Sequence, residues 1–196
     1  GPGQGGPPRA NLASTAASPR PMCGLAGLIL PEGVACSREL LTRMTRTLHR
    51  RGPDDEGFYV DGSVGLGFRR LSVIDLATGH QPMTNEDGSV VVVMNGEIYN
   101  FRELRDELVG LGHTFATRSD TEVLVHGYAA FGEAVLDRIS GMFAFALYDK
   151  SRETVFMARD RIGKKPLKYF MNSCQDRTKG ICPESGKALT VLRRDD

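Results

Sequence analysis

Short β-rich runs are the feature of this sequence that most restricts its fold. Each run is apolar or β-branched and is bounded by polar or glycine-containing turns, which is typical of buried strands. The single runs are residues 23–30, 90–94, 142–148, 154–158 and 167–171, and residues 58–60 and 64–68 flank Asp61-Gly62, a turn pair suited to a hairpin. Because strands outnumber clear alternations of strand and helix, we predict an α+β fold in which helices cover antiparallel sheets.

Amphipathic segments between these runs predict helices. Ser37 precedes a segment with leucine and methionine residues on one helical face, which ends in a basic cluster before Gly52. Capping boxes predict two further helices, because Asn100 and Ser119 each stand three residues before a glutamate. A short helix is expected around residues 135–139.

Charge and hydropathy exclude several classes of function. The 196 residues include 25 lysines and arginines and 24 aspartates and glutamates, so the formal net charge is only +1. Such a chain has no overall field toward nucleic acid or an anionic membrane, and neither is expected as a partner. Its longest apolar stretches, 25–30 and 90–94, are far shorter than the ~20 residues of a membrane-spanning helix.

The cysteines and histidines carry no recognisable ligand pattern in the sequence. Four cysteines are too few and too irregularly spaced for a disulfide framework or a zinc site, which favours a reduced, cytoplasmic protein. The four histidines are scattered without ligand spacing, so no metal site is expected. These residues are Cys23, Cys36, Cys174, Cys182, His49, His80, His113 and His126.

Three segments are expected along the chain. Residues 1–22 are rich in Gly, Pro, Ala and Ser and lack acidic residues, which predicts a disordered leader or upstream sequence. A transit-like leader, a propeptide and translated sequence ahead of a start at Met22 all remain open. Residues 23–170 form the folded domain, and residues 171–196 are expected to be an irregular, truncated tail.

Cys23 is a candidate nucleophile because it follows Met22 and precedes Gly24. Removal of the methionine would leave a thiol and a free α-amine on one residue. An α-amine has a pKa of ≈ 7.7–8.0 and can accept the thiol proton near neutral pH, which creates the reactive thiolate. The alternative is that Cys23 is a small buried hydrophobe at the start of a strand.

Three other features suit acyl transfer on an amino acid, and each has a plainer interpretation. Asn95 and Gly96 offer amide donors for an oxyanion hole, or form an Asn-Gly turn. Arg70 can clamp a carboxylate bidentately, or is a solvated surface charge. Asp120 can bind an ammonium group, or only complements a helix dipole.

These features occur together, in the same order, in one family. Residues 22 to 170 resemble the glutaminase domain of asparagine synthetase and related class II glutamine amidotransferases. The matching runs are Met-Cys-Gly at 22–24, Arg-Gly-Pro-Asp at 51–54, Arg-Leu-Ser-Val-Ile-Asp at 70–75, Gln-Pro at 81–82, residues 95–100, Ser-Asp-Thr-Glu at 119–122, Gly-Met-Phe-Ala-Phe-Ala at 141–146, Ala-Arg-Asp at 158–160 and Lys-Pro-Leu at 165–167.

The resemblance implies a fold and a set of roles. The fold would be that of the N-terminal-nucleophile hydrolases, an αββα four-layer sandwich of two antiparallel sheets. Cys23 would attack the side-chain amide of glutamine, form a thioester and release ammonia, while Asn95 and Gly96 hold the oxyanion. The implied substrate-binding residues are Arg70 for the α-carboxylate, Glu97 and Asp120 for the α-ammonium, and the backbones of Leu71 and Val73 along the pocket.

The resemblance also implies what lies outside this domain. Complete asparagine synthetases continue into a domain that binds ATP, Mg²⁺ and aspartate, so no cofactor is expected here and a synthetase domain or subunit is the expected ammonia acceptor. A homodimer is left open, as is a truncated, misspliced or frame-shifted product. Two alternative functions also remain: a non-catalytic glutamine-binding or interaction domain, because residues 1–22 acylate the amine of Cys23, and a glutaminase serving a different acceptor.

Overall fold

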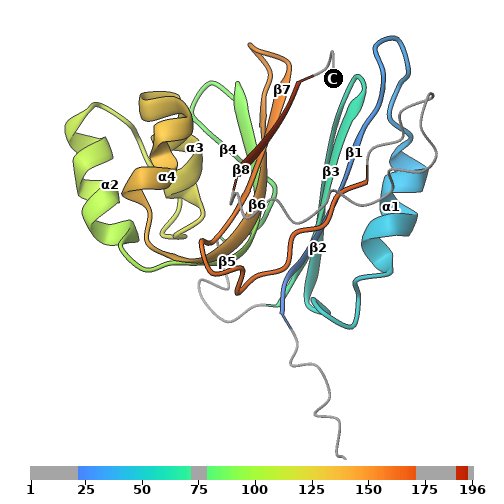
Figure 1. Ribbon diagram of the computed structural model, residues 1–196, viewed down its shortest axis with the longest axis horizontal. Coiled ribbons are helices and arrows are strands. Elements are labelled where there is room, and N and C mark those ends of the chain that lie inside the picture. The colour runs from blue at the N-terminus through green and yellow to red at the C-terminus, as the bar shows by residue number, and fades with distance from the viewer. Residues whose placement is uncertain (1–21, 72–78, 171–188, 194–196) are drawn as a thin grey trace, which may run out of the picture.

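Two antiparallel sheets stack face to face and are flanked by helices in the computed structural model, which describes residues 22–71, 79–170 and 189–193 (Figure 1). One sheet has the strand order β1-β3-β2 and the other β4-β5-β6-β7-β8. The strands are β1 (Gly24–Ile29), β2 (Asp55–Asp61), β3 (Val64–Arg70), β4 (Met83–Thr84), β5 (Val90–Ile98), β6 (Gly141–Asp149), β7 (Thr154–Arg159) and β8 (Leu189–Arg193). The helices are α1 (Arg38–Arg46), α2 (Phe101–Gly110), α3 (Glu122–Phe131), the 3-10 turn η1 (Gly132–Ala134) and α4 (Val135–Arg138).

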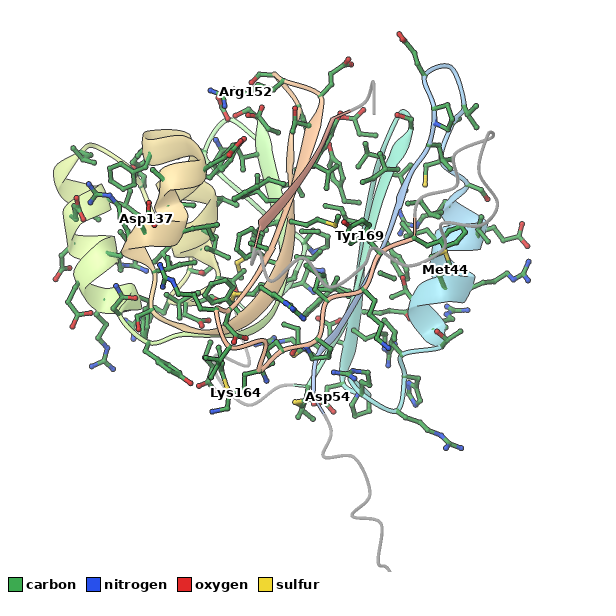
Figure 2. All side chains as sticks on the ribbon, in the orientation of Figure 1. Met44, Asp54, Asp137, Arg152, Lys164 and Tyr169 are labelled. Atoms are coloured by element: carbon green, nitrogen blue, oxygen red, sulfur yellow. The ribbon has the colours of Figure 1, made fainter. Side chains whose placement is uncertain are left out.

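Strand β5 supplies side chains to both faces of the five-stranded sheet because successive residues of a strand point to opposite sides. Val91 and Val93 join the core between the two sheets, with β3 on the opposite side. Val90, Val92 and Met94 join the second core, beneath α2 and α3. The αββα sandwich predicted from the sequence is therefore confirmed, and the side chains that fill its layers are drawn in Figure 2.

Helix α1 covers the outer face of the smaller sheet. Its start is capped as the sequence predicts, because the Ser37 side chain accepts a hydrogen bond from the Leu40 N–H at 3.2 Å. A Cβ atom on Gly67 of β3 would lie 2.0 Å from Thr45 Oγ1 of this helix. The glycine thus permits close packing of helix on sheet.

The helices after Asn100 and Ser119 form, but the predicted capping boxes are wrong. The Asn100 side chain instead donates to the Arg138 carbonyl and accepts from the Ser140 N–H, both at 2.8 Å. Helix α3 begins only at Glu122, whose carboxylate accepts the Ala116 and Thr117 N–H groups of the preceding loop. A tertiary contact thus occupies the Asn100 side chain, whereas at the second helix the Ser119 hydroxyl accepts the Thr121 N–H and Glu122 bonds the loop just before the helix.

Two features of the C-terminal part differ from the predicted pattern. Residues 167–170 form no strand, although Leu167 and Tyr169 pack against the core between the sheets, which explains their apolar alternation (Figure 2). Strand β8 lies within the stretch for which an irregular tail is expected and pairs with β7 from Leu189↔Ala158 to Arg193↔Thr154. This pairing satisfies backbone groups of β7 that would otherwise form a sheet edge.

Among the described residues, no helix has the length and hydropathy needed to cross a membrane.

Candidate active site

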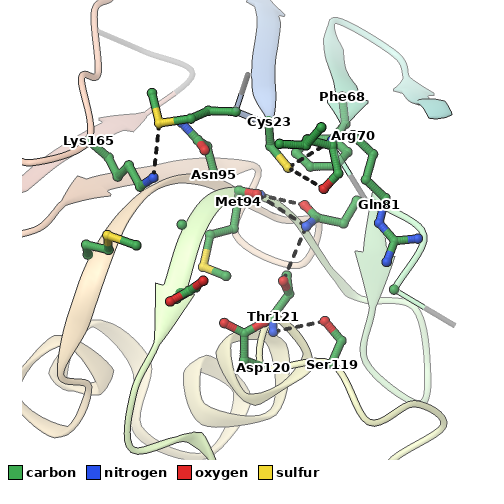
Figure 3. A pocket seen from close by; sticks show the side chains of 16 residues that line it. Cys23, Phe68, Arg70, Gln81, Met94, Asn95, Ser119, Asp120, Thr121 and Lys165 are labelled. Atoms are coloured by element: carbon green, nitrogen blue, oxygen red, sulfur yellow. Dashed lines mark hydrogen bonds between the residues drawn. The ribbon is translucent and has the colours of Figure 1, made fainter. Parts of the chain in front are cut away.

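A cavity of about 200 Å³ lies at one end of the sandwich and brings residues from several elements together (Figure 3). Its lining includes the two residues before β1, the end of β3, the second half of β5 and the segment that leads into α3. Of the predicted site residues, Cys23, Arg70, Leu71, Asn95, Gly96, Glu97 and Asp120 all line it. Val73 lies outside the described residues.

Cys23 presents its thiol to this cavity immediately before β1. Its Sγ lies 3.3 Å from the Leu71 N–H, which donates to it, and 3.7 Å from the Leu71 carbonyl. Burial raises the pKa of the Cys23 thiol, and the Leu71 hydrogen bond and the positive charges of Arg70 and Lys165 only partly offset this effect. The thiol therefore needs a base before it can act as a nucleophile at neutral pH.

Asn95 lies within β5, not in a turn after it. Strand β5 runs on to Ile98, with Asn95 opposite Ala144 and Gly96 opposite Phe143 on β6. The Asn95 side chain is 5% exposed, and within the described ranges its amide has no hydrogen-bond partner. Since buried polar groups are normally hydrogen-bonded, this amide is suited to a ligand.

The backbone of β5 places a second hydrogen-bond donor, the Gly96 N–H, near the Asn95 amide. The Met94 N–H donates to Gln81 Oε1 at 2.6 Å and the Ile98 N–H donates to Asp120 Oδ2 at 2.8 Å. Alternate N–H groups of a strand point to the same edge, so the Gly96 N–H points to this edge as well. Strand β4 pairs only as far as Met83↔Val92, so it does not cover Gly96. The geometry leaves a backbone donor beside the Asn95 amide.

Arg69 and Arg70 point to opposite faces of β3. Arg69 is directed toward α1, where its guanidinium donates to the carbonyls of Gly52 and Pro53 and to Glu56. Arg70, which shares its face with Phe68, lines the cavity and is 7% exposed. The alternation of the strand thus directs one arginine to the loop after α1 and the other to the cavity.

Two carboxylates line the cavity from β5 and from the residues before α3. Burial raises the pKa of the Asp120 carboxyl, the Ile98 hydrogen bond lowers it, and the negative charge of Glu97 raises it again, so that the net shift is upward. The Glu97 carboxylate is thus near enough to disfavour ionisation of Asp120. A cationic group placed between them would relieve this repulsion.

Comparison with protein families assigns the chain to one of them. The model of the glutamine amidotransferase domain family matches residues 22–189, most of the chain. The chain belongs to the glutamine amidotransferase domain family.

Several glutamine-hydrolyzing asparagine synthetases are similar to this family member. It is 50% identical over 151 residues to asparagine synthetase 2 of Bacillus subtilis, with 76% of this chain and 20% of that protein covered. It is 43% identical over 147 residues to the asparagine synthetase of Sandersonia aurantiaca, with 74% of this chain and 28% of that protein covered. The chain thus spans less than a third of the length of these curated relatives.

A solved structure of glutamine phosphoribosylpyrophosphate amidotransferase from B. subtilis, complexed with ADP and GMP, is 26% identical to this chain. The match has a TM-score of 0.48 and covers 76% of this chain and 33% of that one.

Gln81 is a pocket residue for which sequence reasoning assigned no role. Its side chain bonds both backbone groups of Met94, accepting from the N–H at 2.6 Å and donating to the carbonyl at 3.2 Å. Its amide also donates to Thr121 Oγ1 at 3.2 Å. By the register of β4 and β5, Gln81 stands opposite Met94, so its side chain replaces the strand partner that β4 no longer supplies. The sequence feature that could have indicated a role for Gln81 is the Gln-Pro run at 81–82, which is one of the runs shared with the family.

Lys165 and Met22 also line the cavity. Lys165 Nζ lies 3.4 Å from Met22 Sδ, and the lysine is 8% exposed. The Asp160 carboxylate accepts the Lys164 and Lys165 N–H groups and so fixes the loop after β7. Lys165 therefore adds positive charge near Cys23, and Met22 occupies space beside it.

Proposed function

We propose that this chain is the glutaminase domain of an asparagine synthetase-like protein and hydrolyses glutamine through Cys23. The observation that carries the proposal is the placement of the Cys23 thiol in one cavity with the donors of β5 and with ionic groups of both signs. Arg70 binds the α-carboxylate of glutamine, and Glu97 and Asp120 bind its α-ammonium. These contacts orient the side-chain amide toward the thiol.

The first step forms a thioester. The Cys23 thiolate attacks the amide carbon and the carbonyl oxygen becomes an oxyanion, which the Asn95 side chain and the Gly96 N–H stabilise. The tetrahedral intermediate collapses, the C–N bond breaks, and the nitrogen leaves as ammonia after taking a proton. Water then attacks the thioester, releases glutamate and restores the thiol.

The base for this reaction is the α-amine of Cys23 itself. In the given sequence its nitrogen is bonded to Met22, and cleavage of that bond frees an amine with a pKa of ≈ 7.7–8.0. The amine takes the thiol proton and passes it to the leaving nitrogen. Cleavage also removes the Met22 side chain from the cavity lining.

The ammonia acceptor belongs to a part outside this chain. We propose aspartate, activated with ATP and Mg²⁺ in a synthetase domain or subunit, because the similar relatives carry the name asparagine synthetase. A different acceptor remains the alternative, and adding aspartate with ATP to the complete protein would distinguish the two through asparagine formation.

The test compares two forms of the protein. Expression from Met22 lets the host remove the methionine, and intact mass verifies a Cys23 terminus. We expect this form to release glutamate and ammonia in equal amounts and a matched Cys23→Ala form to release neither. A Cys23→Ala form that hydrolyses glutamine as fast as its parent would contradict the proposal.

A second candidate function applies when residues 1–22 are retained. Met22 lines the cavity and its bond to Cys23 blocks the amine, which favours glutamine binding without hydrolysis. The 196-residue chain would then bind glutamine in calorimetry yet form no glutamate. Turnover by a chain whose measured mass includes residues 1–22 would eliminate this candidate.

A further inference from the structure

A cluster of two histidines and a glutamate lies outside the catalytic cavity. Glu86 stands in the turn between β4 and β5, His113 in the loop after α2, and His126 on α3. One ligand atom from each residue can be chosen so that all three atoms lie within 4.8 Å of one another. The fold joins three segments here that are far apart in the sequence.

Both imidazoles of the cluster contact the carboxylate of Glu86. Nδ1 of His113 lies 3.1 Å from Glu86 Oε1, and Nδ1 of His126 lies 3.1 Å from Glu86 Oε2. A tetrahedral ion with bonds of ≈ 2.0–2.1 Å places its ligand atoms about 3.3 Å apart. Small side-chain movements would let both imidazoles and the carboxylate bind one ion.

The charges around the cluster favour a cation. The Glu86 carboxylate accepts the Thr114 N–H at 2.9 Å and lies against both imidazoles. A second carboxylate, Glu122, is 3% exposed and accepts hydrogen bonds from two backbone N–H groups and from Thr117 Oγ1. A divalent ion would balance the negative charge of these two carboxylates.

His126 is oriented as a metal ligand usually is. Its ring is 1% exposed, and while Nδ1 faces Glu86, Nε2 lies 3.4 Å from Glu122 Oε1. A ligating histidine normally gives its other N–H to a carboxylate, which fixes the ring and its tautomer. Phe115 packs against the same ring with a centroid separation of 4.4 Å.

We propose that Glu86, His113 and His126 bind a divalent transition-metal ion such as Zn²⁺, with Glu122 as the positioning residue for His126. Two imidazoles and one carboxylate are a donor set that zinc accepts, and water completes the tetrahedron from the partly exposed side of Glu86. The ion would tie the β4–β5 turn and the loop after α2 to α3. This proposal does not depend on the glutaminase activity.

The test titrates metal into the full chain after treatment with a chelator. Cys23→Ala serves as the parent because, among the described residues, it removes the thiol that is not buried. Binding of Zn²⁺ is followed by calorimetry and that of Co²⁺ by its d–d absorption. We expect one ion per chain, the spectrum of a tetrahedral site without thiolate charge transfer, and a higher Tm with Zn²⁺.

The variants distinguish this site from adventitious binding. Glu86→Gln keeps the shape of the residue, and His113→Ala removes a partly exposed ring, so both should fold and bind about tenfold or more weakly. His80→Ala is the matched control, because His80 Nδ1 also contacts a carboxylate, Asp55 at 2.6 Å, outside the cluster. Absence of saturable binding, or equal affinity in the parent and both cluster variants, would overturn the proposal.

Discussion

At the residue scale, the surroundings of a buried polar side chain indicate whether it supports structure or a ligand. Asn85 is 8% exposed and fully engaged, because it accepts from the Val90 N–H and donates to the Ser89 hydroxyl. Asn95 is as buried, yet no described residue bonds to its amide. The same residue type therefore closes a turn in one place and lines the cavity in the other.

Replacing Asn95 with alanine should reduce catalysis more than stability. Loss of one oxyanion donor typically lowers kcat by about 10²–10³. Steady-state glutamine hydrolysis by the Cys23-terminal form measures this, with Asn85→Ala as the matched control, which should lower the unfolding free energy but leave kcat near that of the parent. Equal kcat values in the parent and Asn95→Ala would refute the assigned role.

Ionisation of Glu86 should make the free energy of unfolding depend on pH in the acid range. Its pKa lies below the ordinary 4.5 and near 2 in the folded chain, so the unfolded state binds a proton first as the pH falls. The contribution of Glu86 is therefore complete above about pH 5 and is lost between that value and about pH 2. In chelator-containing urea titrations, Glu86→Gln should lose less stability than wild type across this window. The control Glu32→Gln, in the exposed loop after β1, should show the same pH dependence of the unfolding free energy as wild type. The effect would be disproved if Glu86→Gln and wild type lost stability in parallel as the pH falls.

At the element scale, β5 shapes both the core and the site. Its first half is buried on both faces, whereas its second half places Asn95, Gly96 and Glu97 along the cavity. Gly96 has φ +149°, and a Cβ atom there would lie 2.1 Å from the Met142 carbonyl oxygen of β6. Because Gly96 has no side chain, the backbones of β5 and β6 can approach closely here, and the strand continues through the Asn-Gly pair.

Gly96→Ala should therefore weaken the β5–β6 pairing. We expect a loss of roughly 2–4 kcal/mol in unfolding free energy, because the clash is with backbone and cannot be relieved by a side-chain rotation. Gly110→Ala at the end of α2 is the control, since nothing lies within 4 Å of its added Cβ. Denaturant unfolding compares the two, and similar stabilities for both variants would argue against the steric explanation.

At the scale of the whole molecule, the sheets differ in how their edges are completed. The larger sheet begins with the two-residue strand β4, supplemented by the Gln81 side chain, and ends with β8. β8 comes from the end of the chain and covers most of β7. The sandwich thus depends on a segment that follows residue 170.

Ending the chain after residue 188 should destabilise the domain and promote association. The change exposes the backbone of β7 from Thr154 to Ala158, and an open strand edge recruits other chains. Each kcal/mol lost should lower Tm by about 2–4 °C in a domain of this size. Calorimetry and light scattering would measure both effects, with a chain ending at Arg193 as the control. An unchanged Tm and a monodisperse shorter chain would show that β8 is dispensable.

The sequence by itself determined the local elements and much of the expected chemistry. Apolar runs, the Asp61-Gly62 turn and the Ser37 cap all act over a few residues, so β1, the β2–β3 hairpin, β5, β6, β7 and α1 could be predicted from them. The ordered motifs also named Cys23 and Asn95 as members of one site, through resemblance to a family. One failure lies where a local signal competes with a distant partner, because the Asn100 side chain bonds Arg138 and Ser140 instead of capping its helix.

Tertiary structure alone decided which side chains meet. Strand register turns Arg70 to the cavity and Arg69 to α1, and pairing of β5 with β6 converts an expected turn into a strand edge that presents the Gly96 N–H. Packing of α3 beside the β4–β5 turn brings His113, His126 and Glu86 together although their spacing in the sequence predicts no metal site. The physical reason is range, because periodicity and turn chemistry encode contacts between near neighbours, whereas a site is assembled by long-range pairing and burial.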